Sequence, residues 1–238
     1  MEVSLLLIKK DISKSWKIRY NVFGGIYMDI KELEVLLNNL GNNKKTKDVD
    51  KLNKILIKSK TDVSFLKDIV LDQQRYHRTY FQVSLGLIKN VEEQFKFIED
   101  NFYNLNDWWH VDQLTQFISK DLSLDYAYKK AKEYINHPHI FARRWAYVMF
   151  MPTLVKNERS FDMIVQLLKD DNEYYVVMAE AWLISYLGIY YPDKTLEYLK
   201  TKPLEYNIVG RAIQKICDSF RINDDYKNKF KEIRRIYK

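Results

Sequence analysis

Apolar residues recur at every third or fourth position along most of the chain, with polar residues between them. This spacing is typical of amphipathic α-helices that bury one face. Two clear series are Phe161, Ile164, Val165 and Leu168, and then Ile208, Ala212, Ile213, Ile216, Cys217 and Phe220. No segment keeps an alternation of apolar and polar residues, so we predict helices and no β-sheet.

The predicted helices come in consecutive pairs: 90–102 with 106–119, 122–136 with 138–151, 158–169 with 172–188, and 193–200 with 204–219. The second helices carry Trp108, Arg144 and Trp182, which stand 36 and 38 residues apart. Helix pairs that repeat at such a period are typical of HEAT and armadillo repeats. We therefore predict an all-α fold, an α-α superhelix (a HEAT- or armadillo-like solenoid of antiparallel helix pairs), in one domain over residues 1–238. An irregular helical bundle is the alternative, because sequence identity between the pairs is negligible.

Helix ends are marked by capping residues, a glycine and prolines. We expect Asn106 or Asp107 to cap the helix over 106–119, and Ser160 to cap another. Gly41 is expected to end the helix IKELEVLLNNL and to open the loop NNKKTKD. Three prolines are expected in the first turns of helices: Pro138, Pro192 and Pro203.

The composition agrees with a helical protein and adds a positive charge. The chain has 238 residues, 47% of them hydrophobic, with only 6 Gly and 4 Pro. This allows a substantial core and leaves too few turn residues for an all-β chain. Lys and Arg outnumber Asp and Glu by 39 to 32, for a formal charge of +7, which can attract nucleic acid or an anionic membrane. A general bias toward Lys, Asn, Ile and Tyr is the competing explanation of this charge.

Cysteine content and apolar runs bear on where the protein works. Cys217 is the one cysteine, so there is no disulfide framework, as is typical of a reducing cytoplasm. The apolar run in MEVSLLLIKK is too short for a signal peptide, and no stretch reaches transmembrane length. We therefore expect a cytoplasmic protein without a membrane anchor.

Candidate chemistry concentrates in the second helices of the pairs. Trp108 and Asp112 are four residues apart in WWHVD and so share one helix face. In a solenoid this face would meet Trp182 and one of the adjacent Arg143 and Arg144 at a concave groove. Taken singly, the tryptophans fit a core, Asp112 a solvated face and the arginines a surface pair. Their joint placement at one level of successive repeats is what predicts a site.

Several segments, in this order along the chain, resemble the AlkD-like DNA alkylation-repair glycosylases: RYHRTYFQVSLGLI, WWHVD, FARRWA, YYVVMAEAW and GRAIQKI. Proteins of that superfamily are HEAT-like solenoids with a W-x-x-x-D motif, an arginine one repeat later and a second tryptophan one repeat after that. The best-matching repeats cover 62–219, between a divergent N-terminal end (1–48) and a basic C-terminal helix (222–238).

The resemblance implies a monofunctional DNA N-glycosylase that excises cationic N3- or N7-alkylated purines. It implies that Asp112 is the catalytic carboxylate and that Trp108 and Trp182 form aromatic walls. It also implies that Arg144 contacts the DNA backbone. The basic residues that we expect to bind DNA are Arg143, Arg144, Arg211 and Lys215.

The expected partner is duplex DNA that contains alkylated bases. We expect a monomer with no cofactor and no metal. The alternative is a catalytically weak or inactive HEAT-like scaffold that binds DNA or protein.

The chemistry of such a lesion agrees with these residue types. A purine alkylated at N3 or N7 is cationic and leaves as a neutral base, so it does not need the strong general acid of ordinary glycoside hydrolysis. One carboxylate can then stabilise the cationic sugar and position a water. Indole faces attract a cation by about 0.5–2 kcal/mol, and an arginine can hold a phosphate by paired hydrogen bonds.

The N-terminal end departs from the family pattern. NVFGGIYMDIKELEVLL resembles the family's Gly-Ile/Val element before a helix, but Met28, Asp29 and Ile30 stand where Pro and Arg are usual. A shortened end would weaken the grip on a duplex. Basic residues that could compensate are Lys14, Lys17, Arg19 and the tail KNKFKEIRRIYK, although the tail also fits a solvated last helix.

The remaining candidates for chemistry are weak. Trp109 is expected in the core or behind the site, and His110 is expected to be exposed. His137 and His139 flank Pro138 without a third ligand in register, so a loop is expected there rather than a metal site.

Overall fold

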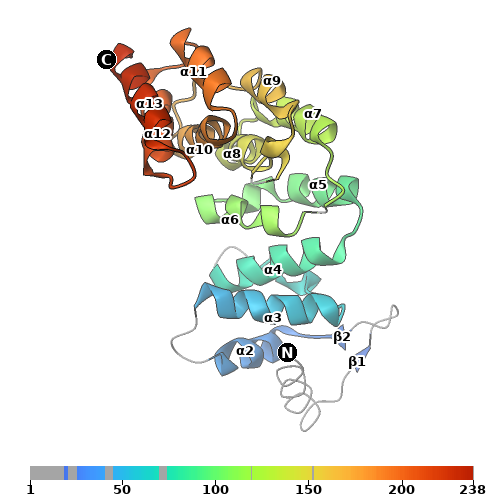
Figure 1. The fold of residues 1–238 in the computed structure, drawn as a ribbon. Helices are drawn as coiled ribbons and strands as arrows, with labels where there is room; N and C mark the ends of the chain where they lie inside the picture. Colours follow the sequence, from blue (N-terminus) through green and yellow to red (C-terminus); the bar gives the residue numbers. More distant parts are fainter. Residues whose placement is uncertain are drawn as a thin grey trace. The chain divides into compact units, whose positions relative to one another are not determined.

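The computed structural model of the protein describes residues 19–20, 26–40, 45–69, 74–118, 120–151 and 153–237. Its α-helices (Figure 1) are α2 (Ile30–Asn39), α3 (Thr46–Lys58), α4 (Gln74–Leu87), α5 (Val91–Asp100), α6 (Trp108–Asp112), α7 (Leu124–Tyr134), α8 (Ile140–Val148), α9 (Ser160–Val165), α10 (Tyr174–Tyr190), α11 (Pro192–Lys200), α12 (Tyr206–Asp218) and α13 (Asp224–Ile236). Short 3₁₀ helices are Ser64–Leu66, Phe102–Asn104, Leu114–Gln116 and Leu154–Lys156. The predicted all-α fold class is confirmed.

The prediction of no β-sheet is wrong at one place. Strands β1 (Arg19–Tyr20) and β2 (Ile26–Tyr27) pair antiparallel, with Arg19 opposite Tyr27 and Tyr20 opposite Ile26. Each strand has only 2 residues, which is too few for an alternation of apolar and polar residues to be recognised.

The helix ends follow some of the sequence signals and not others. Asp107 caps α6, because its Oδ1 accepts a hydrogen bond from the backbone N–H of Trp108 at 2.7 Å. Pro192 is the first residue of α11, as predicted. Ser160 is not a cap: it is the first residue of α9, and its buried hydroxyl donates to the carbonyl of Val155 at 2.8 Å.

Four other local predictions are wrong. Pro138 and Pro203 precede the N-caps of α8 and α12 instead of lying in first turns. Residues 41–44 lie outside the described residues, but the predicted loop is helical from Thr46 onward. Phe220 lies beyond the end of α12 and is 95% exposed, although its spacing matches the buried face of that helix.

Contacts divide the chain into two compact units. Unit 1 comprises Met1–Asp100 and Gln116–Ser119, and unit 2 comprises Asn101–Thr115 and Lys120–Lys238. The prediction of a single domain over residues 1–238 stays a prediction. None of the helices in the described ranges has the length and apolar character needed to cross a membrane.

Unit 1 is built around the packing of α3 against α4. Leu56 of α3 and Phe81 of α4 are 3% and 0% exposed, and the buried Nδ2 of Asn53 donates to Oε1 of Gln82 at 2.8 Å. At the departure from the family pattern, Asp29 caps α2 and forms a reciprocal capping box with Glu32.

That capping box is a local reason for an aspartate at position 29. Met28, beside Asp29, is buried. Lys14, Lys17 and the side chain of Arg19 lie outside the described residues.

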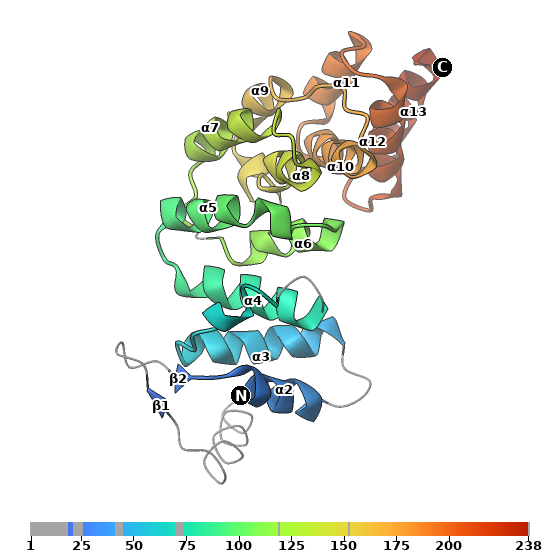
Figure 2. The ribbon, with the colours of Figure 1, turned by 180° about the vertical axis from the view of Figure 1, so that it is seen from behind.

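Unit 2 is a stack of helix pairs in two layers (Figure 2). One layer contains α8, α10 and α12, with α10 packed against both of the others, and the second layer contains α7, α9 and α11. The core between α10 and the C-terminal helices is apolar and closed, with Ile184, Leu199, Ile213 and Phe230 each no more than 1% exposed. This pairing is consistent with an α-α superhelix, and α8, α10 and α12 are the predicted second helices.

Candidate active site

A pocket of about 460 Å³ in unit 2 gathers most of the predicted site residues. It is lined from four helices by Trp108 and Asp112 of α6, Arg144 of α8, Trp182 of α10 and Lys215 of α12. These residues are far apart in sequence, and the stacking of α8, α10 and α12 brings them together.

Asp112 and Arg144 form a bidentate ion pair inside this pocket. Arg144 donates to Oδ1 of Asp112 from Nε at 3.1 Å and from Nη2 at 2.8 Å, and Nη2 also lies 3.1 Å from Oδ2. Its Nη1 donates to the carbonyl of Tyr175 at 2.7 Å, and Arg144 is only 4% exposed. Arg144 therefore links α6 to α10 and fixes the direction of the Asp112 carboxylate.

Burial dominates the electrostatics of the Asp112 carboxylate. It raises the pKa of Asp112, and the charge and hydrogen bonds of Arg144 lower that pKa without cancelling the effect. Asp107 adds a smaller upward contribution to the pKa, and Lys215 a smaller downward one. The negative charge of Asp112 is thus less stabilised by its surroundings than that of an aspartate in water.

Both predicted indoles remain accessible to solvent. Trp108 is 49% exposed, and Trp182 is half-buried, with its ring centroid 6.2 Å from that of Tyr186 in an edge-on arrangement. Neither indole is sealed in the core, and both line the same pocket as Asp112.

The other predicted basic residues are placed differently. Arg143 pairs with Asp171 at 2.8 Å and donates to the carbonyl of His137, and it does not line the pocket. Of the two adjacent arginines, only Arg144 faces it. Arg211 lies beside the pocket, with its guanidinium 5.5 Å from the ring centroid of Tyr174.

Sequence reasoning missed three residues of α10 that line the pocket: Tyr174, Tyr175 and Met178. A signal was present, since Tyr174, Met178, Trp182 and Tyr186 follow one another at intervals of four residues and so share one helix face. None of these four is fully buried, although the rest of the helix is largely core. An incompletely buried stripe of large residues on an otherwise buried helix indicates a surface that is available for binding.

The two residues that follow Trp108 do not line the pocket. Trp109 is half-buried, as expected for a residue behind the site, and its ring lies edge-on to His110 with centroids 4.0 Å apart. The prediction that His110 is exposed is wrong. It is buried, its Nδ1 accepts from the backbone N–H of Asn106 at 3.1 Å, and burial lowers its pKa to about 4.

His137 and His139 lie in the connection between α7 and α8, with His139 at the N-cap of α8. Within the described ranges of the chain, no group of three or more His, Cys, Asp or Glu side chains is arranged to hold a metal ion.

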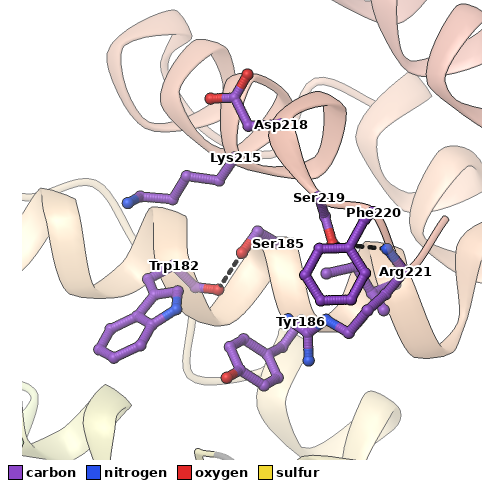
Figure 3. Close-up of a pocket in the computed structure, with 9 residues that line it drawn as sticks. Trp182, Ser185, Tyr186, Lys215, Asp218, Ser219, Phe220 and Arg221 are labelled. Carbon is purple, nitrogen blue, oxygen red and sulfur yellow. Dashed lines mark hydrogen bonds between the residues drawn. The ribbon is translucent and has the colours of Figure 1, made fainter.

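A second pocket of about 550 Å³ adjoins the first and shares Trp182 and Lys215 with it. Figure 3 shows it between the second half of α10 and the turn that follows α12. Its far wall consists of Tyr186, the exposed Phe220 and Arg221, whose guanidinium lies 4.8 Å from the centroid of the Tyr186 ring. Aromatic and cationic side chains therefore continue along α10 beyond Trp182.

The family model for DNA alkylation repair enzymes matches residues 45–216, a span that includes every residue lining the first pocket. Searches of curated proteins and of solved structures found no match.

Proposed function

The chain belongs to the family of DNA alkylation repair enzymes, and from this premise we propose that it is a DNA N-glycosylase for cationic N3- or N7-alkylated purines in duplex DNA. One observation carries the proposal: Asp112 shares a pocket with the accessible indoles of Trp108 and Trp182. An anion and two π-faces are the groups that stabilise a cation.

In the proposed reaction the bond between the sugar C1′ and the alkylated base breaks with both electrons going to the base. The base is cationic beforehand and neutral afterwards, so no protein acid is required, and positive charge develops on the sugar. Asp112 stabilises this charge and orients the water that adds to C1′. Because burial leaves its own charge poorly stabilised, the carboxylate gains more from a nearby cation than a solvated one would.

Arg144 acts in this proposal as a positioning residue for Asp112. It is 4% exposed, and its donors reach Asp112 and the carbonyl of Tyr175. It keeps Asp112 ionised in a buried setting and fixes its direction. The contact with the DNA backbone that the family resemblance implies for Arg144 would use the second N–H of Nη1.

The DNA strand is proposed to follow α10 and α12. Lys215 and Arg211 border the first pocket, and Arg221 lines the second. Phosphates contacted by such cations release counterions, so affinity should fall steeply as salt rises. Arg143 is paired with Asp171, and we assign it a role in stabilising α8 instead of one in binding DNA.

The test is base release by the wild-type chain. Duplex DNA methylated with a simple alkylating agent is incubated with excess protein, and free 3-methyladenine and 7-methylguanine are quantified by mass spectrometry. We expect release of at least one of these bases well above spontaneous depurination. No release from either lesion by protein that binds the duplex in a salt-dependent way would favour the inactive DNA-binding scaffold. No release and no DNA affinity even at low salt would favour a scaffold for protein.

A further inference from the structure

Lys215 occupies the junction of the two pockets, since it lines both. Figure 3 shows its side chain extending from α12 toward Trp182, with the amine directed away from Asp218. With the residues that the structure describes, the amine forms no hydrogen bond and no ion pair. A basic side chain without a partner in a pocket is available to a ligand.

The surroundings of Lys215 make its protonated form less stable than that of a lysine in water. Burial lowers the pKa of Lys215, and the positive charges of Arg144 and Arg211 lower it further, whereas Asp218 and Asp112 act in the opposite direction. The net shift is downward. A neutral lysine amine is a nucleophile toward carbonyl carbon.

We propose that Lys215 gives the protein a second activity, cleavage of the DNA strand at the abasic site that base excision leaves, through an imine with C1′ of the deoxyribose. The inference rests on the proposed function for its natural substrate, and it departs from the monofunctional enzyme that the family resemblance implies. Its geometric basis is the presence of Lys215 and Asp112 in one pocket, because the chemistry requires a nucleophilic amine and a base at the same sugar.

The first stage forms the imine. The abasic sugar is in equilibrium with its open-chain aldehyde, which has a carbonyl at C1′. The lone pair of the Lys215 Nζ attacks C1′, and the carbonyl oxygen takes up two protons and leaves as water. The product is a protonated imine between C1′ and Nζ, which attracts electrons from C2′.

The second stage breaks the strand. A base, for which Asp112 is placed, removes a proton from C2′, and the electron pair forms the C2′–C3′ double bond. The C3′–O bond breaks, and the phosphate leaves as the 5′-phosphate end of the downstream strand. Water then adds to the imine carbon, which releases an unsaturated aldehyde and restores the Lys215 amine. The water lost in the first stage balances the water used here, and no oxidant or reductant is needed.

The experiment uses the full chain and a duplex in which one abasic site has been made beforehand by removing uracil. Sodium borohydride reduces an imine to a stable amine and so links protein to DNA covalently. We expect a borohydride-dependent cross-link, and without borohydride a nick that leaves an unsaturated aldehyde at the 3′ end. Peptide mass spectrometry of the cross-linked protein should place the adduct on Lys215.

The variants compare two lysines with matched substitutions. Lys215→Arg keeps the positive charge and cannot form the imine, so the cross-link and the nick should fall at least about tenfold. Lys229→Arg is the control, because Lys229 is exposed on α13 and lines neither pocket, and it should behave as wild type. A cross-link that is absent from wild type, maps to another lysine or survives in folded Lys215→Arg would overturn the proposal.

The preformed abasic site separates this inference from the proposed function. Cross-linking at Lys215 without release of alkylated bases would remove the glycosylase proposal and keep the lyase. Base release without a cross-link would do the reverse. If Lys215→Arg does not fold, the position of the adduct in the wild-type protein still decides the matter.

Discussion

Each compact unit contains an aspartate–arginine pair, and the two carboxylates have opposite pKa shifts. In unit 1, Asp50 accepts from Nε and Nη2 of Arg78 at 2.6 and 2.9 Å, and also from Nε2 of Gln82 at 2.8 Å. In unit 2, Asp112 accepts from Arg144 and from no other side chain in the part of the chain that the structure describes. The pKa of Asp50 is lowered and that of Asp112 is raised.

The solvent exposure of the two side chains is similar, but Asp112 lies deeper among protein atoms than Asp50, which contributes to the difference. Their side chains are 23% and 20% exposed, and burial is the largest influence on both pKa values, raising each. At Asp50 the hydrogen bonds of Arg78 and Gln82, together with the charges nearby, outweigh burial. At Asp112 no second side chain among the described residues adds a hydrogen bond to those of the arginine, and the charge of Asp107 adds to the upward shift of the pKa.

The comparison separates a carboxylate that holds two helices together from one that is available for chemistry. Asp50 receives three strong donors, which satisfy its charge within the protein. Asp112 is fixed in direction by Arg144, but burial leaves its charge less well stabilised, so a cation entering the pocket would add to that stabilisation. Each prediction below tests whether this difference governs function.

The largest effect is expected from removing the two negative charges separately. Asp112→Asn should lower the single-turnover rate of 7-methylguanine release by about 100- to 1,000-fold, the usual size for loss of one group that stabilises transition-state charge. Asp50→Asn should leave that rate within about threefold of wild type and lower the free energy of unfolding by about 1.5–3 kcal/mol instead.

Urea denaturation of both variants completes this test. Asp112→Asn is also expected to lose stability, since it leaves the buried Arg144 without its ion-pair partner, so both rates are measured well below the denaturation midpoints. If Asp50→Asn lost as much base release as Asp112→Asn while still folded, the distinction between the two pairs would be wrong.

The second prediction concerns Glu180, a buried carboxylate on α10 whose hydrogen-bond donor is a backbone N–H instead of an arginine. Its Oε1 accepts from the backbone N–H of Lys169 at 2.9 Å, and burial raises its pKa from 4.5 to about 8. The folded protein therefore keeps Glu180 protonated at a pH where the unfolded chain has released the proton. Stability from this group is present at low pH and is lost as pH rises from about 4.5 toward 8.

Glu180→Gln removes this dependence and should stabilise the protein at the upper end of that range. The free energy of unfolding of the variant, relative to wild type, should rise by about 1.4 kcal/mol per pH unit between roughly pH 5 and 7. Denaturant melts at three pH values measure it. A difference that stays constant with pH would show that Glu180 is ionised in the folded state, as Asp50 is expected to be.

How much the sequence predicts can be judged from α12 and α6. The apolar spacing that predicted the helix over 204–219 also defines the buried face of α12, because one period governs both. The convergence of Trp108, Arg144 and Trp182 could be anticipated from their separations of 36 and 38 residues along the chain. Phe220 could not be placed correctly, since spacing alone does not reveal that α12 ends before it.

The pKa of Asp112 and the exposure of His110 depend on tertiary packing, which the spacing of residues along the chain does not predict. His110 follows Trp109 in a short helix, and its burial comes from the turn in which Asn106 bonds to its ring. The burial of Arg144 likewise depends on the packing of α8 against α6 and α10. A sequence can propose which residue types meet, but the donors and the burial around them decide their charge.

The third prediction concerns Arg144→Gln, a substitution that removes the arginine of the Asp112–Arg144 ion pair and keeps the carboxylate. Arg144→Gln takes away an opposite charge and the hydrogen bonds, so the pKa of Asp112 should rise further. Base release should then fall more at the acidic end of the pH profile than at the basic end, because protonation of the carboxylate extends to higher pH than in the wild type. We expect a loss in the free energy of unfolding of about 1.5–3 kcal/mol.

A pH–rate profile of Arg144→Gln provides the measurement, and Arg78→Gln in unit 1 is the matched variant. Arg78→Gln should lose a similar amount of stability and keep the wild-type pH profile. A uniform loss of rate at every pH in Arg144→Gln would show that the arginine acts on the DNA directly and not through Asp112.

The smallest effect on the rate of base release is expected from Trp108. Here the comparison extends from the two carboxylates to two tryptophans. Trp108 is 49% exposed, whereas Trp145 of α8 is 0% exposed. Trp108→Ala should barely change the unfolding midpoint and should weaken transition-state stabilisation for a cationic base by about 0.5–2 kcal/mol, or roughly 2- to 30-fold in rate. Trp145→Ala should instead lower stability by about 3–5 kcal/mol, because it leaves a cavity.

The charge of the lesion makes this last prediction specific. If Trp108 acts through its π-face, Trp108→Ala should weaken binding to a duplex with cationic 7-methylguanine and leave binding to the unmodified duplex nearly unchanged. Competition binding at fixed salt with the two duplexes measures the ratio. Equal weakening of both would mean that Trp108 supplies only contact area, and the attraction of the pocket for a cation would then rest on Asp112 and Trp182.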